Sequence, residues 1–147
     1  MREIFLFSEV PFLRVSKKSL AALIALLDAH YQPENRGALS IAFLKHDRLA
    51  RMHADFCGDP TPTDIITFPG IEEGTFGELC ISPQAALDYA KKHRGNPTEE
   101  LTRYVIHGYL HLLGYDDIRP KDRAQMRRQE KICLGLAKGI RGLFIFR

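Results

Sequence analysis

The chain has 147 residues, of which 45% are hydrophobic and 27% are charged, and its formal charge at pH 7 is +3. This balance is typical of a soluble globular protein and excludes a disordered chain, while the charge is too small to indicate a polyanionic partner by itself. Three cysteines without a C-x-x-C pair exclude a disulfide framework and fit a reduced compartment. We therefore expect one cytoplasmic domain over residues 1–147, with no membrane partner.

Four stretches have the composition of β-strands, because each is apolar, contains β-branched or aromatic residues, and is bounded by turn formers. In chain order they are Ile4–Val10, Leu39–Lys45, Asp64–Pro69 and Glu78–Ile81. The apolar tail Gly142–Arg147 is expected to pack as an extra strand or against the domain.

Helical patterns lie between and after these strands, and several begin at a capping residue. We expect helices from Ser16 through Leu27, from Asp47 to before Asp55, after Ser82, from Asn96 to Gly114, and from Arg123 to Lys138. Strands and helices are thus mixed along the chain. The predicted fold class is α+β, with a small four-stranded sheet, mostly parallel or mixed, packed with about five helices.

The helix between Asn96 and Gly114 combines a wide apolar surface with a narrow polar stripe. At about 100° per residue, apolar side chains cover most of its circumference, which is typical of a core helix. The remaining sector holds Glu100, Arg103, His107 and His111. Because polar groups are costly to bury, such a stripe must be exposed, be paired or line a site.

The two histidines of this stripe predict a metal site. His107 and His111 stand four residues apart, so both imidazoles project from one face and can hold a single cation. Gly114 lets the chain leave the helix in a left-handed turn, which can return Asp117 to the same ion. Two imidazoles and a carboxylate around an open position are a ligand set of hydrolytic zinc, so we expect one Zn²⁺ ion on this helix and the following turn.

Two alternatives to this ligand set remain open. Asp116 is one residue away from Asp117 and can serve as the third ligand instead. A stripe of exposed or hydrogen-bonded histidines without any metal is the other interpretation of the pair.

The segment HGYLHLLGYDD, His107–Asp117, resembles the signature H-G-x-L-H-L-x-G-Y-D-H of the YbeY family of metal-dependent endoribonucleases. Further segments resemble family motifs in the same order: PTDIITFP at Pro62–Pro69, GELCIS at Gly77–Ser82 and MRRQEKIC from Met126. The resemblance spans roughly Met52 to Cys133. It implies an α/β arrangement around a small mixed sheet, and bacterial, cytoplasmic processing of ribosomal RNA.

Two positions depart from the family pattern. The family's third metal ligand is usually histidine, where this chain has Asp117; an oxygen donor suits zinc but leaves the ion a weaker Lewis acid. An arginine thought to meet the RNA is replaced by Cys57, which we expect to be a small, half-buried side chain. Arg51 or the helix residue Arg103 is then the expected RNA contact.

The resemblance and the predicted site together imply a zinc-dependent endoribonuclease that prefers single-stranded RNA. It would mature the 3′ end of small-subunit ribosomal RNA, act in ribosome quality control and use a metal-activated water, with the ribosome or ribosomal proteins as partners. Asp64 is the candidate general base or a residue that orients a metal ligand, although it can equally be a turn residue bonded to its own backbone.

Two other functions compete with this one. The first is a ribosome-associated RNA-binding factor whose metal is mainly structural. The second is a metal-dependent hydrolase of another substrate, including peptides. A peptidase is disfavoured because the position of the base in the H-E-x-x-H metalloprotease motif is occupied by Gly108.

Overall fold

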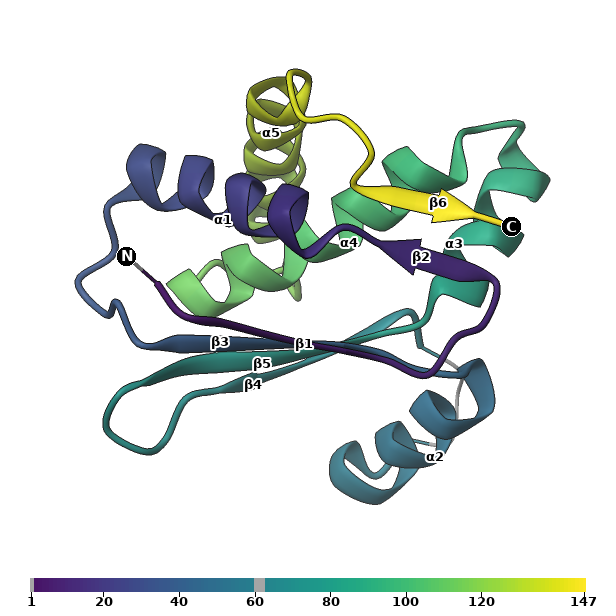
Figure 1. Cartoon of the computed structure of the whole chain (residues 1–147). Coiled ribbons are helices and arrows are strands. Elements are labelled where there is room, and N and C mark those ends of the chain that lie inside the picture. The colour runs from purple at the N-terminus through teal and green to yellow at the C-terminus, as the bar shows by residue number, and fades with distance from the viewer. Residues whose placement is uncertain (1, 60–62) are drawn as a thin grey trace.

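The structure is a computed structural model that describes residues 2–59 and 63–147 (Figure 1). Its helices are α1 (Lys17–Tyr31), α2 (His46–Cys57), α3 (Pro83–His93), α4 (Pro97–Leu113) and α5 (Pro120–Ala137). Its strands are β1 (Ile4–Ser8), β2 (Leu13–Val15), β3 (Ala38–Phe43), β4 (Ile65–Pro69), β5 (Thr75–Ile81) and β6 (Phe144–Phe146). The predicted α+β class is confirmed. Pro62, the first residue of the PTDIITFP segment, lies outside the described residues.

Four of the strands form one mixed sheet in the order β1-β3-β5-β4. The first three run parallel, and β4 is antiparallel to β5. Parallel neighbours need a crossover, which α1 supplies between β1 and β3, whereas a short turn is enough to join β4 to β5. The sequence prediction of a four-stranded, mostly parallel or mixed sheet is therefore confirmed.

The helices cover the two faces of the sheet unequally. In Figure 1, α1, α4 and α5 lie on one side of the sheet, and α2 lies beneath the other side near one end. The main core fills the space between the sheet and the first two of these helices, with fully buried side chains such as Leu23, Leu79 and Tyr109. Since α5 packs on α1 and α4, it forms an outer layer.

Gly108 sets how closely α4 approaches the sheet. A Cβ atom at this position would lie 2.7 Å from side-chain carbons of both Ile65 and Leu79. Because this is shorter than van der Waals contact, only glycine lets the helix rest on β4 and β5 at this distance. Gly108 occupies the position where the H-E-x-x-H metalloprotease motif has glutamate, and here it has a packing role.

A buried ion pair fastens the start of the chain to two helices. Arg2 donates two hydrogen bonds of 2.9 Å to the carboxylate of Asp28 on α1. The Tyr109 hydroxyl of α4 donates to the same carboxylate at 2.7 Å. Since the Arg2 and Asp28 side chains are only 2% and 9% exposed, each neutralises a charge that would otherwise be costly to bury. The sequence analysis did not identify this pair.

A strand pairing and a helix boundary differ from the prediction. The tail does form a strand, β6, but it pairs antiparallel with β2 in a separate two-stranded ribbon that was not expected. The last helix begins at Pro120 rather than Arg123, since proline suits the first turn of a helix. Among the described residues, no helix is long and apolar enough to cross a membrane.

Candidate metal centre

The three side chains predicted as metal ligands lie together at the carboxyl end of α4. Nε2 of His107 lies 3.0 Å from Nε2 of His111, and Oδ2 of Asp117 lies 3.3 Å from the first and 3.4 Å from the second. Atoms bound at about 2.0–2.1 Å to a tetrahedral zinc ion are about 3.3–3.4 Å apart. The separations therefore suit one small cation, and all three side chains remain partly exposed.

Local backbone geometry brings Asp117 to the histidines. Gly114 ends α4 with a φ of 108°, a left-handed conformation that favours glycine. The chain then turns back along the helix end before α5 begins. The guanidinium of Arg123 donates to the carbonyl of Ile118, which ties the returning loop to the first turns of α5.

The neighbouring acid, Asp116, has a different role. Its Oδ1 atom accepts a hydrogen bond of 2.7 Å from the backbone N–H of Asp117, and the residue is exposed. Within the described part of the chain, only Asp117 joins the two histidines in a group able to hold a metal. The geometry therefore favours Asp117 as the third ligand.

Glu130 of α5 is a site residue that the sequence reasoning missed. It is buried, and its carboxylate lies 2.6 Å from Nδ1 of His107 and accepts a 3.0 Å hydrogen bond from Arg103. Burial raises the pKa of this carboxyl, but the hydrogen bonds from His107 and Arg103 outweigh it and hold the pKa below its usual value. Two signals were available in the sequence: Glu130 lies in the MRRQEKIC segment that resembles a family motif, and it shares a helix face with Met126 and Cys133.

The contact with Glu130 prepares His107 for metal binding. When Nδ1 carries the proton and donates it to the carboxylate, the Nε2 lone pair points into the ligand group. The imidazole ring is also held in one orientation. An ion at this site would then meet a ligand that needs little rearrangement.

Arg103, a predicted RNA contact, belongs to the same network. Its guanidinium pairs with Glu100 on its own helix and with Glu130 on α5, and its side chain is 32% exposed. Burial lowers the pKa of the guanidinium, but the hydrogen bonds to both carboxylates outweigh burial and raise this pKa above its usual value. The group therefore stays charged. Its observed contacts hold Glu130 in place; contact with RNA stays a prediction.

The other predicted residues lie outside the ligand group. Asp64 stands just before β4 and lines a cavity with His46, Tyr89 and Tyr104. Arg51 is exposed on α2, which Figure 1 places on the opposite side of the sheet from α4. The expectation that Cys57 is half-buried is wrong, because the last residue of α2 is exposed to solvent.

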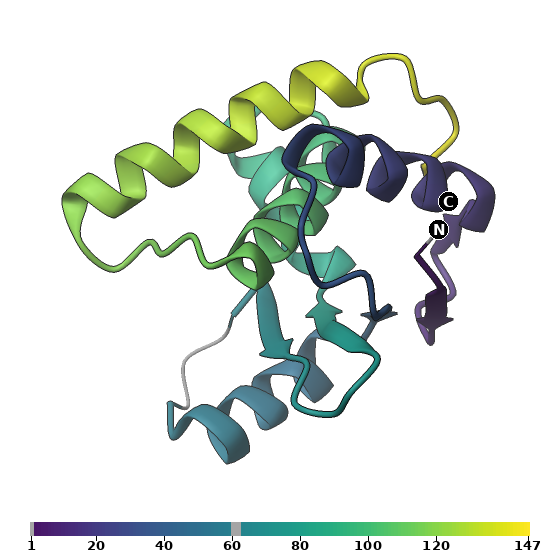
Figure 2. The ribbon, with the colours of Figure 1, turned by 90° about the vertical axis from the view of Figure 1, so that its left-hand side faces the viewer.

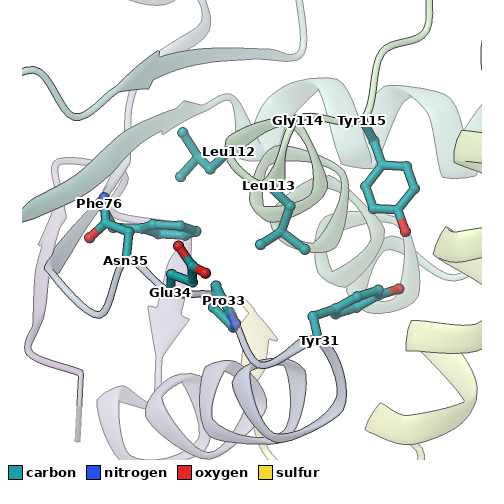
Figure 3. A pocket seen from close by; sticks show the side chains of 9 residues that line it. All are labelled: Tyr31, Pro33, Glu34, Asn35, Phe76, Leu112, Leu113, Gly114 and Tyr115. Carbon is teal, nitrogen blue, oxygen red and sulfur yellow. The ribbon is translucent and has the colours of Figure 1, made fainter.

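A cavity of about 620 Å³ opens beside the end of α4 (Figure 3). Its walls include Tyr31, Phe76, Leu113 and Tyr115, and Figure 3 shows the two tyrosine rings on the same side of the opening. Tyr115 belongs to the loop that carries Asp117. The cavity therefore borders the loop of the candidate metal centre, although none of the three candidate ligands lines it.

Two imidazoles and a returning carboxylate, here presented by an α+β scaffold, are a donor set that hydrolytic metal centres use. The sequence profile of the family described as Endoribonuclease YbeY matches residues 10–137. An endoribonuclease YbeY from Protochlamydia amoebophila is 37% identical over 121 residues, or 78% of this chain and 81% of that protein. The corresponding protein of Chlamydia trachomatis serovar D is 32% identical over 139 residues, or 90% and 86%.

The fold has a solved relative as well. The solution structure of a Thermotoga maritima protein matches with a TM-score of 0.65 and 27% identity, over 92% of this chain and 89% of the other. The chain belongs to the YbeY endoribonuclease family. The resemblance read from the His107–Asp117 signature is confirmed, and so is the prediction of an enzyme of the nuclease class.

Proposed function

We propose that the protein is a zinc-dependent endoribonuclease that cuts single-stranded RNA during ribosomal RNA maturation. One Zn²⁺ ion would be held by His107, His111 and Asp117. The observation that carries the proposal is the convergence of the three donor atoms, 3.0 to 3.4 Å apart, in a member of an endoribonuclease family. Action on the 3′ end of small-subunit RNA, a role in ribosome quality control, binding to ribosomal proteins and a cytoplasmic location belong to the same proposal.

The donor set fits zinc by its chemistry. Two imidazole nitrogens and one carboxylate oxygen are ordinary zinc ligands, and three protein ligands leave a position for water or substrate. A bound zinc ion supplies a Lewis acid that lowers the pKa of water and stabilises negative charge on phosphate oxygens. Because the three side chains are partly exposed, a phosphodiester can approach the site from solvent.

The residues around the ligands have separate tasks in this proposal. Glu130 accepts the Nδ1 proton of His107 and orients its ring. Arg103 holds Glu130 and, being partly exposed, is the proposed contact to RNA next to the ion, with Arg51 as a more distant one. Asp64 remains the proposed proton-transfer group; its cavity includes Tyr104, which lies one helical turn before His107.

The proposal is tested by metal content and RNA cleavage of the purified protein. We expect one equivalent of zinc, cleavage of single-stranded RNA in preference to duplex RNA, loss of cleavage with a chelator and recovery with Zn²⁺. His111→Ala should lose both the metal and the activity. If the wild-type protein with zinc cuts RNA no faster than His111→Ala does, the proposed enzyme function is wrong.

The same experiment separates the competing functions. Zinc retained without RNA cleavage, together with RNA binding, would support the RNA-binding factor with a structural metal. Peptide hydrolysis that His111→Ala abolishes would support another hydrolase. The structure weighs against a peptidase, since Gly108 packs directly on Ile65 and Leu79 and a glutamate there would have no room.

A further inference from the structure

The exposed face of α5 carries a row of cations beside the candidate metal centre. We propose that Arg123, Arg127 and Lys131, here called the α5 stripe, bind consecutive phosphates of the RNA strand that enters this centre. The inference rests on the proposed function, because it takes the substrate to be RNA. It adds the surface that holds the strand.

The spacing of the α5 stripe suits a single strand. The three residues follow one another at intervals of four, and all three are exposed. Four residues advance a helix by about 6 Å, which is close to the separation of neighbouring phosphates in an extended nucleic acid strand. Each helical turn therefore offers one cation for one phosphate.

The stripe lies on the side of α5 where the metal centre is. Glu130 contacts His107, whereas Gln129 accepts a hydrogen bond from Tyr31 of α1. At about 100° per residue, the stripe residues fall about 20°, 60° and 100° round the helix from Glu130, and Gln129 falls about 100° in the opposite direction. The stripe thus continues outward from the ligand group, away from α1.

Figure 2 shows where α5, which carries this surface, lies relative to the other helices. Helix α5 crosses above α1 and α4, and its first turns extend to the left of α4 in this view. The loop with Asp117 leads directly into these turns. A strand on the α5 stripe can therefore reach the ligand group without passing through the core.

The charges of the stripe are available to an anion. Among residues 2–59 and 63–147, neither Arg127 nor Lys131 has an ion-pair or hydrogen-bond partner for its side chain. Arg123 donates to the Ile118 carbonyl, which leaves its positive charge uncompensated. Glu130, the acid next to Lys131 on α5, is buried and already paired with Arg103, and Asp122, the acid next to Arg123, is paired with Arg119. A polyphosphate strand is the complementary partner, since cations that neutralise phosphates release condensed counterions.

The test measures RNA affinity with cleavage prevented by a chelator. A fluorescent single-stranded oligouridylate is titrated with the protein at several potassium chloride concentrations. The triple variant Arg123→Gln, Arg127→Gln, Lys131→Gln should bind at least about tenfold more weakly at low salt, and its slope of log affinity against log salt should be about 2 smaller. This corresponds to three lost phosphate contacts on single-stranded RNA.

A matched control removes the same charge elsewhere. Arg14 of β2 and Lys17 and Lys18 at the start of α1 are exposed cations. The start of α1 lies on the opposite side of Figure 2 from the start of α5. Their replacement by glutamine should change the salt slope much less. Equal effects of the two triple variants would overturn the inference, because general charge alone would then explain binding.

Two further variants keep the outcomes distinguishable. Arg127→Gln, Lys131→Gln leaves the Arg123 contact to the loop intact, and it should show about two thirds of the slope change if the triple variant proves unstable. His111→Ala should lose cleavage while keeping RNA affinity. If the stripe variants bind RNA more weakly but the wild type does not cut RNA, only the proposed nuclease function is contradicted. If the wild type cuts RNA but the stripe variants bind RNA as well as the wild type does, only this inference is contradicted.

Discussion

Nδ1 of His107 lies 2.6 Å from Oε2 of Glu130, which joins the candidate metal centre on α4 to the outer helix α5. The carboxylate is buried, and its other oxygen is held by Arg103 at 3.0 Å. A buried charge with two cationic or protonated partners costs little to keep in one position. The pair therefore fixes the imidazole ring more firmly than a solvent-exposed contact can.

The first prediction concerns this pair. Glu130→Gln keeps the shape of the side chain but removes the charge that stabilises the Nδ1 proton, so zinc affinity should fall by about 10–100-fold. Competition with a chromophoric chelator measures this. Glu100→Gln is the matched control, because it removes the other carboxylate bound to Arg103 without touching His107, and it should keep near-normal zinc affinity. Equal losses of zinc affinity in both variants would show that negative charge near Arg103, and not the contact with His107, accounts for the effect of Glu130.

The second prediction separates the two adjacent acids. Losing a residue that only orients a metal ligand typically lowers metal affinity by about 10–100-fold. Asp117→Asn removes a ligand itself, so it should lower zinc affinity by more than this. Asp116→Asn should have a small effect, because an amide oxygen can still accept the 2.7 Å hydrogen bond from the Asp117 backbone. Isothermal titration with zinc compares them. A larger loss for Asp116→Asn than for Asp117→Asn would contradict the prediction and make Asp116 the third ligand.

The third prediction concerns stability. Asp28→Ala should lower the free energy of unfolding by about 3–5 kcal/mol, because it leaves the buried Arg2 guanidinium without its counterion. Urea denaturation provides the measurement. Asp122→Ala is the control: its partner Arg119 is 82% exposed, and removing such a surface pair should cost only about 0–1 kcal/mol. Similar losses in the two variants would contradict the role given to burial.

The fourth prediction concerns the thiols and pH. Cys57 is exposed, whereas Cys80 and Cys133 are buried. Burial, with a smaller contribution from Glu78, raises the pKa of Cys80 to about 12. Iodoacetamide should therefore modify one thiol of the folded protein at pH 8 and all three in urea, as counted by mass spectrometry. The variant Cys57→Ser should show no modification when folded.

The raised pKa of Cys80 also gives a sign for stability against pH. The unfolded thiol loses its proton near its ordinary pKa, while the folded thiol keeps it up to about 12. This thiol therefore costs no stability below the ordinary pKa of a thiol. The free energy of unfolding falls as pH rises from that value towards about 12, because only the unfolded thiol then loses its proton. Urea midpoints should fall between pH 8 and pH 10 by less in Cys80→Ala than in the wild type, and an equal fall would contradict this assignment.

Much of the candidate site could be predicted because its signals are local. Asn96 caps α4 through hydrogen bonds to the next turn, and Gly114 ends it in a left-handed conformation, so both ends follow from neighbouring residues. The spacing of His107 and His111 likewise places both on one helix face. Their predicted role as zinc ligands stays a prediction that the proposed experiments address, and the single domain also stays a prediction.

The sequence by itself determined the helix with its polar stripe, the four main strands and the family signature, because each depends on residues within a few positions of one another. Only the tertiary structure decided that Glu130 meets His107 across 23 positions, that Arg2 pairs with Asp28, and that β6 joins β2. Such contacts form when whole helices and strands pack. Their partners are selected by the shape of the assembled core, which no short window of sequence contains.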